Sequence, residues 1–210
     1  MCAVCLRPGS SCICHWVTPI AHAVEVVILQ HPLEVMNAKG SARLLHLSLA
    51  HSRMVTGEVF EAPLLHGLLT APFDAQAQNP KARQPVLLYP QTPQDAALGL
   101  SVAPRVSPEW LSDPSSLRLI VLDGTWRKSR KMLYLNPPLQ RLPRLALHDM
   151  AASHYLIRKA HRPDQLSTLE ATCAALAQLE GSAAPLAPLL AAFDGFVAQQ
   201  LGYRVKADGE

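Results

Sequence analysis

No apolar stretch of the 210-residue chain reaches the roughly 20 residues that a membrane-spanning helix needs, which excludes a transmembrane segment of that kind. Residues 1–5 show no basic region followed by an apolar one, so the sequence has no recognisable secretory signal. From these two absences we expect a cytoplasmic protein that has no membrane partner.

Two glycine-rich phosphate-binding patterns are also missing, Gly-x-Gly-x-x-Gly and Gly-x-x-x-x-Gly-Lys-Ser/Thr. Their absence argues against a dinucleotide-binding fold and against a P-loop nucleotidase. The nine histidines are scattered, and none has the His-Glu-x-x-His spacing of a metalloprotease. Charge is scarce too, since 17% of the residues are charged and 49% are hydrophobic. That composition supplies enough apolar side chains for a sizeable core.

Cysteine is concentrated at one end of the chain. Four of the five cysteines form a Cys-x-x-Cys pair followed by a Cys-x-Cys pair, namely Cys2, Cys5, Cys12 and Cys14. Thiols clustered in this way in a cytoplasmic chain favour a metal over disulfides, and four thiolates suit a structural Zn²⁺. His15 could replace one thiolate, and free or redox-active thiols are the alternative. Cys173 stands alone in an apolar helical pattern and is predicted to be a buried small hydrophobe.

Short apolar runs alternate with segments of helical spacing along the rest of the chain. Strands are predicted within 23–30, 58–60, 85–90, 119–122 and 142–147. Helices are predicted after Ser41 and over 126–135, 168–180 and 185–201. This alternation predicts an α/β fold with a mainly parallel sheet and flanking helices. We expect a Cys-rich zinc-binding segment over residues 1–20 and a main domain over 21–205.

The strand predicted at 119–122 runs into Asp123, Gly124, Thr125 and Trp126. Asp123 and Gly124 form a turn, and Thr125 can cap a helix that begins at Trp126. An acid, a hydroxyl and an indole would then lie together at the carboxyl end of a strand, where open α/β sheets bind ligands. The alternative is an ordinary strand–turn–helix corner in which Trp126 is a core anchor.

Basic residues are concentrated between positions 118 and 162, where only two acids stand. More than half of the 19 lysines and arginines therefore fall in about a fifth of the chain. This concentration indicates a polyanionic partner, most simply a nucleic acid, unless the side chains point in several directions as solvated faces. The ten residues are Arg118, Arg127, Lys128, Arg130, Lys131, Arg141, Arg144, Arg158, Lys159 and Arg162.

Asp123-Gly124-Thr125-Trp126 with the basic helix behind it resembles the Asp-x-Thr-Trp signature of the DTW-domain proteins. Other stretches are similar to that family in the same order, from residue 2 to about residue 180. They are the N-terminal cysteines, Gln30-His31-Pro32-x-Glu34, Ser41-x-Arg43-Leu44, Leu88-Tyr89-Pro90, Tyr155-x-Ile157-Arg158 and Leu166-Ser167-Thr168-Leu169-Glu170-Ala171.

The resemblance implies a tRNA-uridine aminocarboxypropyltransferase. Such an enzyme moves the 3-amino-3-carboxypropyl group of S-adenosyl-L-methionine to N3 of a uridine and releases methylthioadenosine. The resemblance also implies a SPOUT-like fold with a C-terminal trefoil knot, in which case residues 21–205 are the catalytic domain. Nothing in the sequence identifies a protein partner, and both a monomer and a homodimer remain open.

On that interpretation Asp123 is the general base for N3, assisted by Thr125 and Trp126, although Asp123 could instead cap the helix or orient the substrate. Arg158 would pair with the methionine carboxylate, with Arg43 as second choice, and Glu34 or Glu170 would hold the ammonium group. Donor-binding residues are expected to be Gln30, Glu34, Arg43, Leu88, Tyr89, Pro90, Leu122, Gly124, Leu147, Tyr155, Arg158, Ser167, Thr168 and Glu170. RNA-binding residues are expected to be Arg127, Lys128, Arg130, Lys131 and Lys159.

Two other functions fit the same residues. One is an S-adenosylmethionine-dependent RNA methyltransferase of the same fold, because fold does not fix function. It would release S-adenosylhomocysteine in place of methylthioadenosine. The other is a non-catalytic, zinc-containing RNA-binding module, which the cysteines and the basic cluster would suffice to build.

Overall fold

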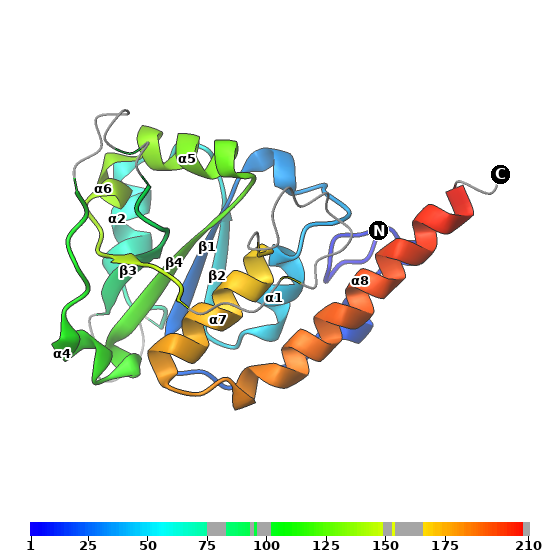
Figure 1. The fold of residues 1–210 in the computed structure, drawn as a ribbon. Coiled ribbons are helices and arrows are strands. Elements are labelled where there is room, and N and C mark those ends of the chain that lie inside the picture. Colours follow the sequence, from blue (N-terminus) through cyan, green and yellow to red (C-terminus); the bar gives the residue numbers. More distant parts are fainter. Residues whose placement is uncertain (75–82, 93–94, 96–101, 149–152, 154–165, 208–210) are drawn as a thin grey trace.

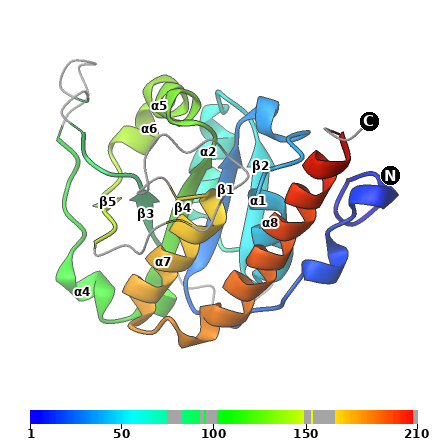
Figure 2. The ribbon, with the colours of Figure 1, turned by 45° about the vertical axis from the view of Figure 1, so that its right-hand side comes forward.

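Five parallel strands form one sheet in the order β2-β1-β4-β3-β5 in the computed structural model (Figures 1 and 2). The structure describes residues 1–74, 83–92, 95, 102–148, 153 and 166–207. The strands are β1 Glu25–Gln30, β2 Ser52–Thr56, β3 Gln84–Leu88, β4 Leu117–Asp123 and β5 Arg144–Leu145.

The two central strands, β1 and β4, are buried along their whole length. A parallel strand covered by helices on both faces has no solvent side, so its sequence is a continuous apolar run instead of an alternating one. Val26 and Ile28 of β1 pack on one face of the sheet, and Val27 and Leu29 pack on the other. The predicted α/β class with a parallel sheet is confirmed.

Helices cover both faces of the sheet (Figures 1 and 2). One apolar cluster joins the sheet to α1 (Ala42–Ser48), α7 (Thr168–Glu180) and α8 (Ala187–Ala207). The other joins it to α2 (Ala62–Thr70), α5 (Trp126–Leu135) and α6 (Pro137–Gln140). The helices that follow β1 and β4 therefore lie on opposite faces, although these two strands are neighbours. Shorter elements are α4 Pro108–Leu111, η1 Gly9–Ser11, η2 Cys14–Trp16, η3 Pro32–Glu34, η4 Pro114–Ser116 and η5 Ala184–Leu186.

The second strand was predicted around residues 58–60, and this prediction is wrong. The strand is β2, and its side chains are half-buried or exposed because it lies at the edge of the sheet. An edge strand lacks the continuous apolar run of a central one, so its sequence signal is weak. The chain then turns into α2, where Pro63 occupies the first turn, a position that suits proline.

Ser41 was predicted to cap α1, but its hydroxyl makes no capping hydrogen bond to that helix. It accepts a hydrogen bond of 3.2 Å from the backbone N–H of Leu169 in α7. The first N–H groups of a helix have no partner within the helix, so a distant hydroxyl can satisfy one of them. The helix ends at 135 and 181 were predicted correctly, and Gly181 takes the left-handed conformation (φ 72°) that closes α7.

Some predictions fall outside the described residues. Tyr155, Arg158 and Lys159 lie in the segment 154–165, whose structure is not described. The trefoil knot also stays a prediction. No helix in the described part of the chain is long and apolar enough to cross a membrane.

Arg118 was counted with the basic cluster, yet its side chain is fully buried at the start of β4. Its guanidinium donates two hydrogen bonds to Glu25, at 2.9 and 2.6 Å, and binds the carbonyls of Leu68 and Ala71 at 2.9 and 2.8 Å. The carbonyls belong to the C-terminal end of α2, where helical carbonyls lack partners. Arg118 therefore fastens α2 to the sheet and cannot contact RNA.

We expect Arg118→Met to lower the free energy of unfolding by about 3–5 kcal/mol, because it leaves the buried carboxylate of Glu25 without its main partner. Urea denaturation followed by circular dichroism measures the loss. The double variant Glu25→Leu/Arg118→Met removes both charges and should be more stable than the single one. A single variant as stable as the parent protein would contradict this role.

Candidate active site

The loops that follow β1 and β4 meet at the carboxyl edge of the sheet. Gln30 and Asp123 are register partners, and the backbone N–H of His31 donates to the Asp123 carbonyl at 2.9 Å. Because α1 and α5 leave these neighbouring strands toward opposite faces, this edge is a topological switch point. Open α/β sheets bind ligands at such points.

Asp123 is the central side chain of this edge and is 5% exposed. Its Oδ2 accepts a hydrogen bond from Gln30 Nε2 at 2.9 Å, and its Oδ1 accepts one from the Thr168 hydroxyl at 2.7 Å. The carboxylate therefore joins the ends of β1 and β4 to the N-terminus of α7, which is distant in sequence. Two donors on separate elements fix its orientation, which a proton acceptor requires.

Thr125 and Trp126 begin α5 as predicted. The Thr125 hydroxyl accepts from the Lys128 N–H at 3.4 Å, which makes it the N-cap. Trp126 is 46% exposed, and its ring meets the edge of Tyr89 at a centroid distance of 5.5 Å and an angle of 76°. The alternative that Trp126 is a core anchor is wrong. A Cβ at Gly124 would lie 3.1 Å from Lys128 Cβ, so a larger residue would crowd this corner.

Ser167 and Glu170, expected to bind the donor, form a capping box at the start of α7. The Ser167 hydroxyl accepts from the Glu170 N–H at 3.1 Å, and Glu170 accepts from the Ser167 N–H at 2.7 Å. Glu170 also accepts hydrogen bonds from the Ser153 hydroxyl. The box fixes the first turn of α7 and therefore places the Thr168 hydroxyl against Asp123.

Glu34 and Arg43 were also expected at the donor site. Glu34 is 4% exposed and accepts from Lys128 Nζ at 2.8 Å and from Asn37 Nδ2 at 2.7 Å. Arg43 donates to the carbonyl of Val4 at 2.6 Å, so it links α1 to the Cys-rich segment. The structure thus places Glu34 beside the corner formed by Asp123, Thr125 and Trp126, called the Asp-Thr-Trp corner below. It directs Arg43 toward the N-terminus.

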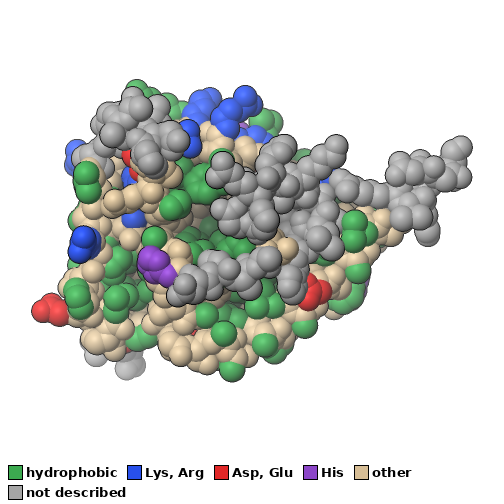
Figure 3. Space-filling view, viewed as in Figure 1, with side chains coloured by type: hydrophobic (Ala, Val, Ile, Leu, Met, Phe, Trp, Pro, Cys, Tyr) green, Lys and Arg blue, Asp and Glu red, His purple; other side chains and the backbone are tan. Residues whose placement is uncertain are grey.

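Lysine and arginine side chains gather over α5 at the top of the face in Figure 3. Lys128 pairs with Glu34, and Lys131 pairs with Glu58 at 2.9 Å. The hydrogen bond from Lys131, and then that from His31, lowers the pKa of Glu58, so this acid neutralises part of the helix's charge. Arg127 is exposed on the same helix and has no ion-pair partner in the described part of the chain.

Sequence reasoning missed Arg144 as a candidate site residue and counted it only among the basic cluster. Arg144 lies in β5, is buried, and forms an ion pair with Asp95. A signal was present, because Arg144 is a charged residue inside the apolar run 142–147. Buried charges in such runs are paired or functional.

The four N-terminal cysteines come together as predicted. Their sulfur atoms all lie within 4.8 Å of one another, with 3.5 Å between Cys2 and Cys14 and 3.7 Å between Cys5 and Cys12. A tetrahedral Zn²⁺ with bonds of about 2.3 Å requires sulfur–sulfur distances of about 3.8 Å, so the cluster fits zinc. None of the four forms a disulfide.

Local hydrogen bonds shift the pKa values of the thiols in this cluster in different directions. Backbone N–H groups of Cys5 and Val4 lower the pKa of Cys2 to about 6. The hydrogen bond with Cys2 is the main reason that the pKa of Cys14 rises to about 12. His15 is exposed and stands outside the four-sulfur cluster, so the ligand set that the geometry supports consists of cysteines alone.

The Cys-rich segment packs against the last helix, beside which it lies in Figure 2. Trp16 Nε1 donates to Gln199 Oε1 at 2.7 Å, and Gln199 donates in turn to the Cys12 carbonyl at 3.3 Å. Trp16 lies over Gly195, where any Cβ would come within 2.2 Å of the indole. Cys5 and Ile13 belong to the same apolar cluster as β1, so the segment is part of the main core.

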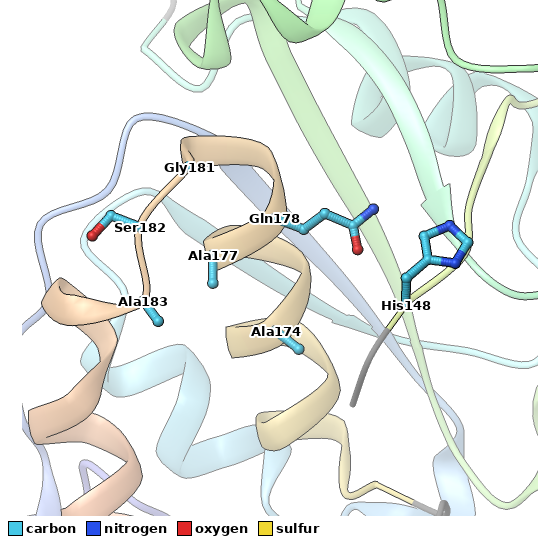
Figure 4. A pocket seen from close by; sticks show the side chains of 7 residues that line it. All are labelled: His148, Ala174, Ala177, Gln178, Gly181, Ser182 and Ala183. Carbon is cyan, nitrogen blue, oxygen red and sulfur yellow. The ribbon is translucent and has the colours of Figure 1, made fainter. Parts of the chain in front are cut away.

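A separate hollow of about 560 Å³ lies beside the C-terminal half of α7 (Figure 4). Gln178 and His148 face each other across it in the figure, and most of the other lining side chains are small. Asp123 contacts Thr168 at the opposite end of α7, so this hollow is distinct from the Asp-Thr-Trp corner. Its lining residues are His148, Ala174, Ala177, Gln178, Gly181, Ser182 and Ala183.

Fold and site together define an α/β protein with an Asp-Thr-Trp corner at the switch point of a parallel sheet and a Cys₄ cluster on its flank. The chain belongs to the DTW domain family, whose model matches residues 1–201. The family that the sequence motifs resembled is thereby confirmed.

Three similar proteins are named as tRNA-uridine aminocarboxypropyltransferases. The chain is 31% identical over 183 residues to tRNA-uridine aminocarboxypropyltransferase 2 of Drosophila melanogaster, covering 85% of this chain and 66% of that protein. It is 30% identical over 184 residues to the Mus musculus protein of the same name, covering 85% and 56%. It is 31% identical over 139 residues to tRNA-uridine aminocarboxypropyltransferase A of Arabidopsis thaliana, covering 63% and 50%.

The chain thus spans about half to two thirds of the length of these curated relatives. No solved structure is significantly similar to it.

Proposed function

We propose that this protein is a tRNA-uridine aminocarboxypropyltransferase that transfers the 3-amino-3-carboxypropyl group of S-adenosyl-L-methionine to N3 of a tRNA uridine. The observation that carries the proposal is the buried carboxylate of Asp123, which Gln30 and Thr168 orient at the strand end that leads into the half-exposed Trp126. The names of the relatives and membership of the DTW family support it.

Asp123 acts as the general base in this mechanism. The uridine N3 carries a proton, and Asp123 accepts it as N3 forms its bond to the Cγ carbon of the donor. The C–S bond breaks at the same time, and its electron pair stays on sulfur, so methylthioadenosine leaves as a neutral thioether. S-adenosylmethionine supplies a positively charged sulfonium, which is a good leaving group without metal assistance.

Gln30 and Thr168 are positioning residues, since they donate to the carboxylate and hold it in one orientation. Both side chains can still hydrogen-bond to Asp123 after it has taken the proton, because the Thr168 hydroxyl can then accept a hydrogen bond from the protonated carboxyl group. A hydroxyl can donate or accept, so no rearrangement of α7 is needed for that change of role. The arrangement thus fixes the position of the proton acceptor.

Trp126 offers its exposed face to the target base. A uridine in a folded RNA must be splayed from its neighbours before N3 can be reached, and an aromatic ring stabilises the splayed base by stacking. The edge contact with Tyr89 restrains the orientation of the indole. The N-terminal end of α5 thus carries both the stacking surface and the basic side chains that would meet the RNA backbone.

Zinc in the Cys₄ cluster would be structural. A closed site with four thiolates has no open position for substrate, so the metal would hold the N-terminal segment and not take part in transfer. We place the enzyme in the cytoplasm with its tRNA substrate, and we propose the C-terminal trefoil knot that the SPOUT resemblance implies.

Incubation of the purified protein with unmodified tRNA and S-adenosylmethionine tests the proposal, with mass spectrometry of the nucleosides and of the small product. We expect a uridine that is heavier by one aminocarboxypropyl group, together with methylthioadenosine. A methylated base with S-adenosylhomocysteine would instead identify a methyltransferase. Intact tRNA binding without any product, on RNA from several sources, would favour the binding module.

Arg127→Glu is expected to weaken tRNA binding about tenfold at low salt and to reduce the salt dependence of the affinity by about one phosphate contact. Arg127 is the suitable position because Lys128 and Lys131 already pair with acids. Fluorescence anisotropy with labelled tRNA at several salt concentrations measures both quantities. Arg105→Glu, an exposed arginine just before α4, is the matched control, and equal losses in both variants would place the RNA elsewhere.

A further inference from the structure

A second buried arginine lies near the Asp-Thr-Trp corner and is incompletely paired. The side chain of Arg144 is 2% exposed. Its Nη1 donates to the carboxylate of Asp95 and to the Pro90 carbonyl, the latter at 3.4 Å. Its Nε and Nη2 are buried and have no hydrogen-bond partner among the described residues. Unpaired buried donors of a charged group are costly, so these two call for an acceptor.

The surroundings of Arg144 connect it to the candidate active site. Its guanidinium lies over the ring of Tyr89, 5.5 Å from the centroid, and the same ring contacts Trp126. The Tyr89 hydroxyl and the Nε of Arg130 are also buried without a partner in the described part of the chain. Burial raises the pKa of Tyr89, and Arg130 and Ser129 lie near enough to oppose that rise without completing a hydrogen bond.

The charge of this group favours an anion. Two guanidinium groups, those of Arg144 and Arg130, and one carboxylate, that of Asp95, lie around the Tyr89 side chain, and Asp95 pairs with Arg144. Burial disfavours the charged form of Asp95, but hydrogen bonds from Thr92 and Arg144 outweigh it, and the pKa of Asp95 is lowered. Asp95 is therefore ionised and neutralises one positive charge, which leaves an excess of one.

The unpaired edge of Arg144 has a defined shape. Nε and Nη2 lie on one side of the planar guanidinium and point their N–H bonds in parallel, which matches the two oxygens of a carboxylate. We propose that this edge of Arg144 binds the α-carboxylate of the aminocarboxypropyl donor. The proposal rests on the proposed function and names the residue that selects the amino-acid arm of the donor.

Strand geometry allows this assignment. Arg144 is level with Leu87 in β3 and with Ile120 in β4, three residues before Asp123. At about 3.3 Å per residue and about 4.8 Å per strand, the Cα atoms of Arg144 and Asp123 are about 14 Å apart. Val121 and Leu145 belong to the cluster under α7, so Arg144 leaves the sheet on the α5 face and Asp123 leaves it on the α7 face. The Arg144 guanidinium extends to the carboxyl edge of the sheet, where its Nη1 lies 3.4 Å from the Pro90 carbonyl, and a donor bound across that edge would meet both residues. An RNA phosphate is a poorer match, because the guanidinium is almost wholly shielded from solvent.

Such a contact would also decide which carbon of the sulfonium reacts. S-adenosylmethionine carries three activated carbons, and only a fixed amino-acid arm presents Cγ in line with N3. A bidentate grip on the carboxylate restricts that arm far more than a single hydrogen bond does. Arg144 would therefore favour aminocarboxypropyl transfer over methyl transfer.

Titration calorimetry with two ligands that differ only in the carboxylate provides the test. The parent protein should bind S-adenosylmethionine about 30-fold more tightly than decarboxylated S-adenosylmethionine, as expected for a charge-assisted bidentate pair. Arg144→Lys keeps a positive charge beside Asp95 but loses the two-pronged edge, so its preference should fall to about threefold or less. Arg141→Lys, a neighbouring exposed arginine, should keep the full preference.

The outcomes separate the two proposals. Equal affinity of the parent protein for both ligands, or an undiminished preference in folded Arg144→Lys, would overturn the carboxylate site and leave the proposed function standing. Loss of tRNA affinity in Arg144→Lys with the preference intact would assign the edge to an RNA phosphate instead. No binding of either ligand by the folded parent protein would remove the proposed function as well. Where the variant does not fold, equal affinity of the parent protein for both ligands still overturns the carboxylate site.

Discussion

Asp123→Ala is expected to reduce aminocarboxypropyl transfer by about a thousandfold while the affinity for S-adenosylmethionine changes only a few-fold. General-base catalysis contributes on the order of 10² to 10⁴ in rate, and Asp123 carries that role in the proposed mechanism. The donor affinity should survive because, in the proposed mechanism, the carboxylate held by Gln30 and Thr168 acts on N3 of the uridine and not on the donor. Single-turnover assays with labelled donor measure the rate, and calorimetry measures the affinity.

Two further variants separate the base from its supports. Asp123→Asn keeps the size of the side chain but cannot accept the proton, so it should be as slow as Asp123→Ala. Thr168→Val removes one hydrogen bond to Asp123 and leaves the base in place, so a loss of about tenfold is expected. Near-normal turnover in Asp123→Asn would exclude Asp123 as the base and leave it an orienting role.

The double variant Cys5→Ser/Cys12→Ser is expected to lose its zinc completely, from about one ion per chain to none, and to unfold about 10–20 °C lower than the parent protein. Structural zinc contributes folding free energy directly, and a loss of about 5 kcal/mol shifts the melting temperature by that amount at this chain length. The effect should reach the whole domain because Cys5 and Ile13 pack in the same core as β1 and α8.

Elemental analysis of the purified protein and thermal unfolding followed by circular dichroism measure these two changes. Cys173→Ala is the matched control, since this buried thiol lies in α7 outside the cluster and should leave the zinc content unchanged. A parent protein that is metal-free and equally stable with or without a chelator would refute the zinc site. The cluster would then be a set of free thiols.

The local structure of the corner was predictable because it is encoded locally. A buried strand, a turn at Asp123 and Gly124, and a capping hydroxyl at Thr125 follow one another directly in sequence, and each obeys a short-range rule. The cysteine cluster was predictable for the same reason, as its ligands lie within a few residues of one another. The edge strand β2 was misplaced because an edge position requires few apolar residues and leaves a weak pattern.

The partners of the corner could not be predicted in the same way. Gln30 lies 93 positions before Asp123, and Thr168 lies 45 positions after it, yet both donate to its carboxylate. Periodicity and capping rules act over a few residues and say nothing about such pairs. Trp126 was open to two interpretations until its exposure was known, because an indole at the start of a helix can face either the core or solvent.

The roles of the individual residues in the basic cluster could not be predicted from the sequence either. Its ten members look alike in the sequence, but Arg118 holds α2 to the sheet and Arg144 lies buried against Tyr89. Lys128 and Lys131 carry their charge next to acids, and Arg127 is left exposed.

The sequence by itself therefore determined the α/β class, the parallel sheet, the Asp-Thr-Trp corner, the cysteine cluster and the family, since each rests on local pattern or on a short motif. Only the tertiary structure decided which charges are buried, which donors orient Asp123, and which arginine edge is unpaired. Those properties depend on which segments, distant along the chain, pack against one another and exclude water. Local sequence patterns do not determine that packing.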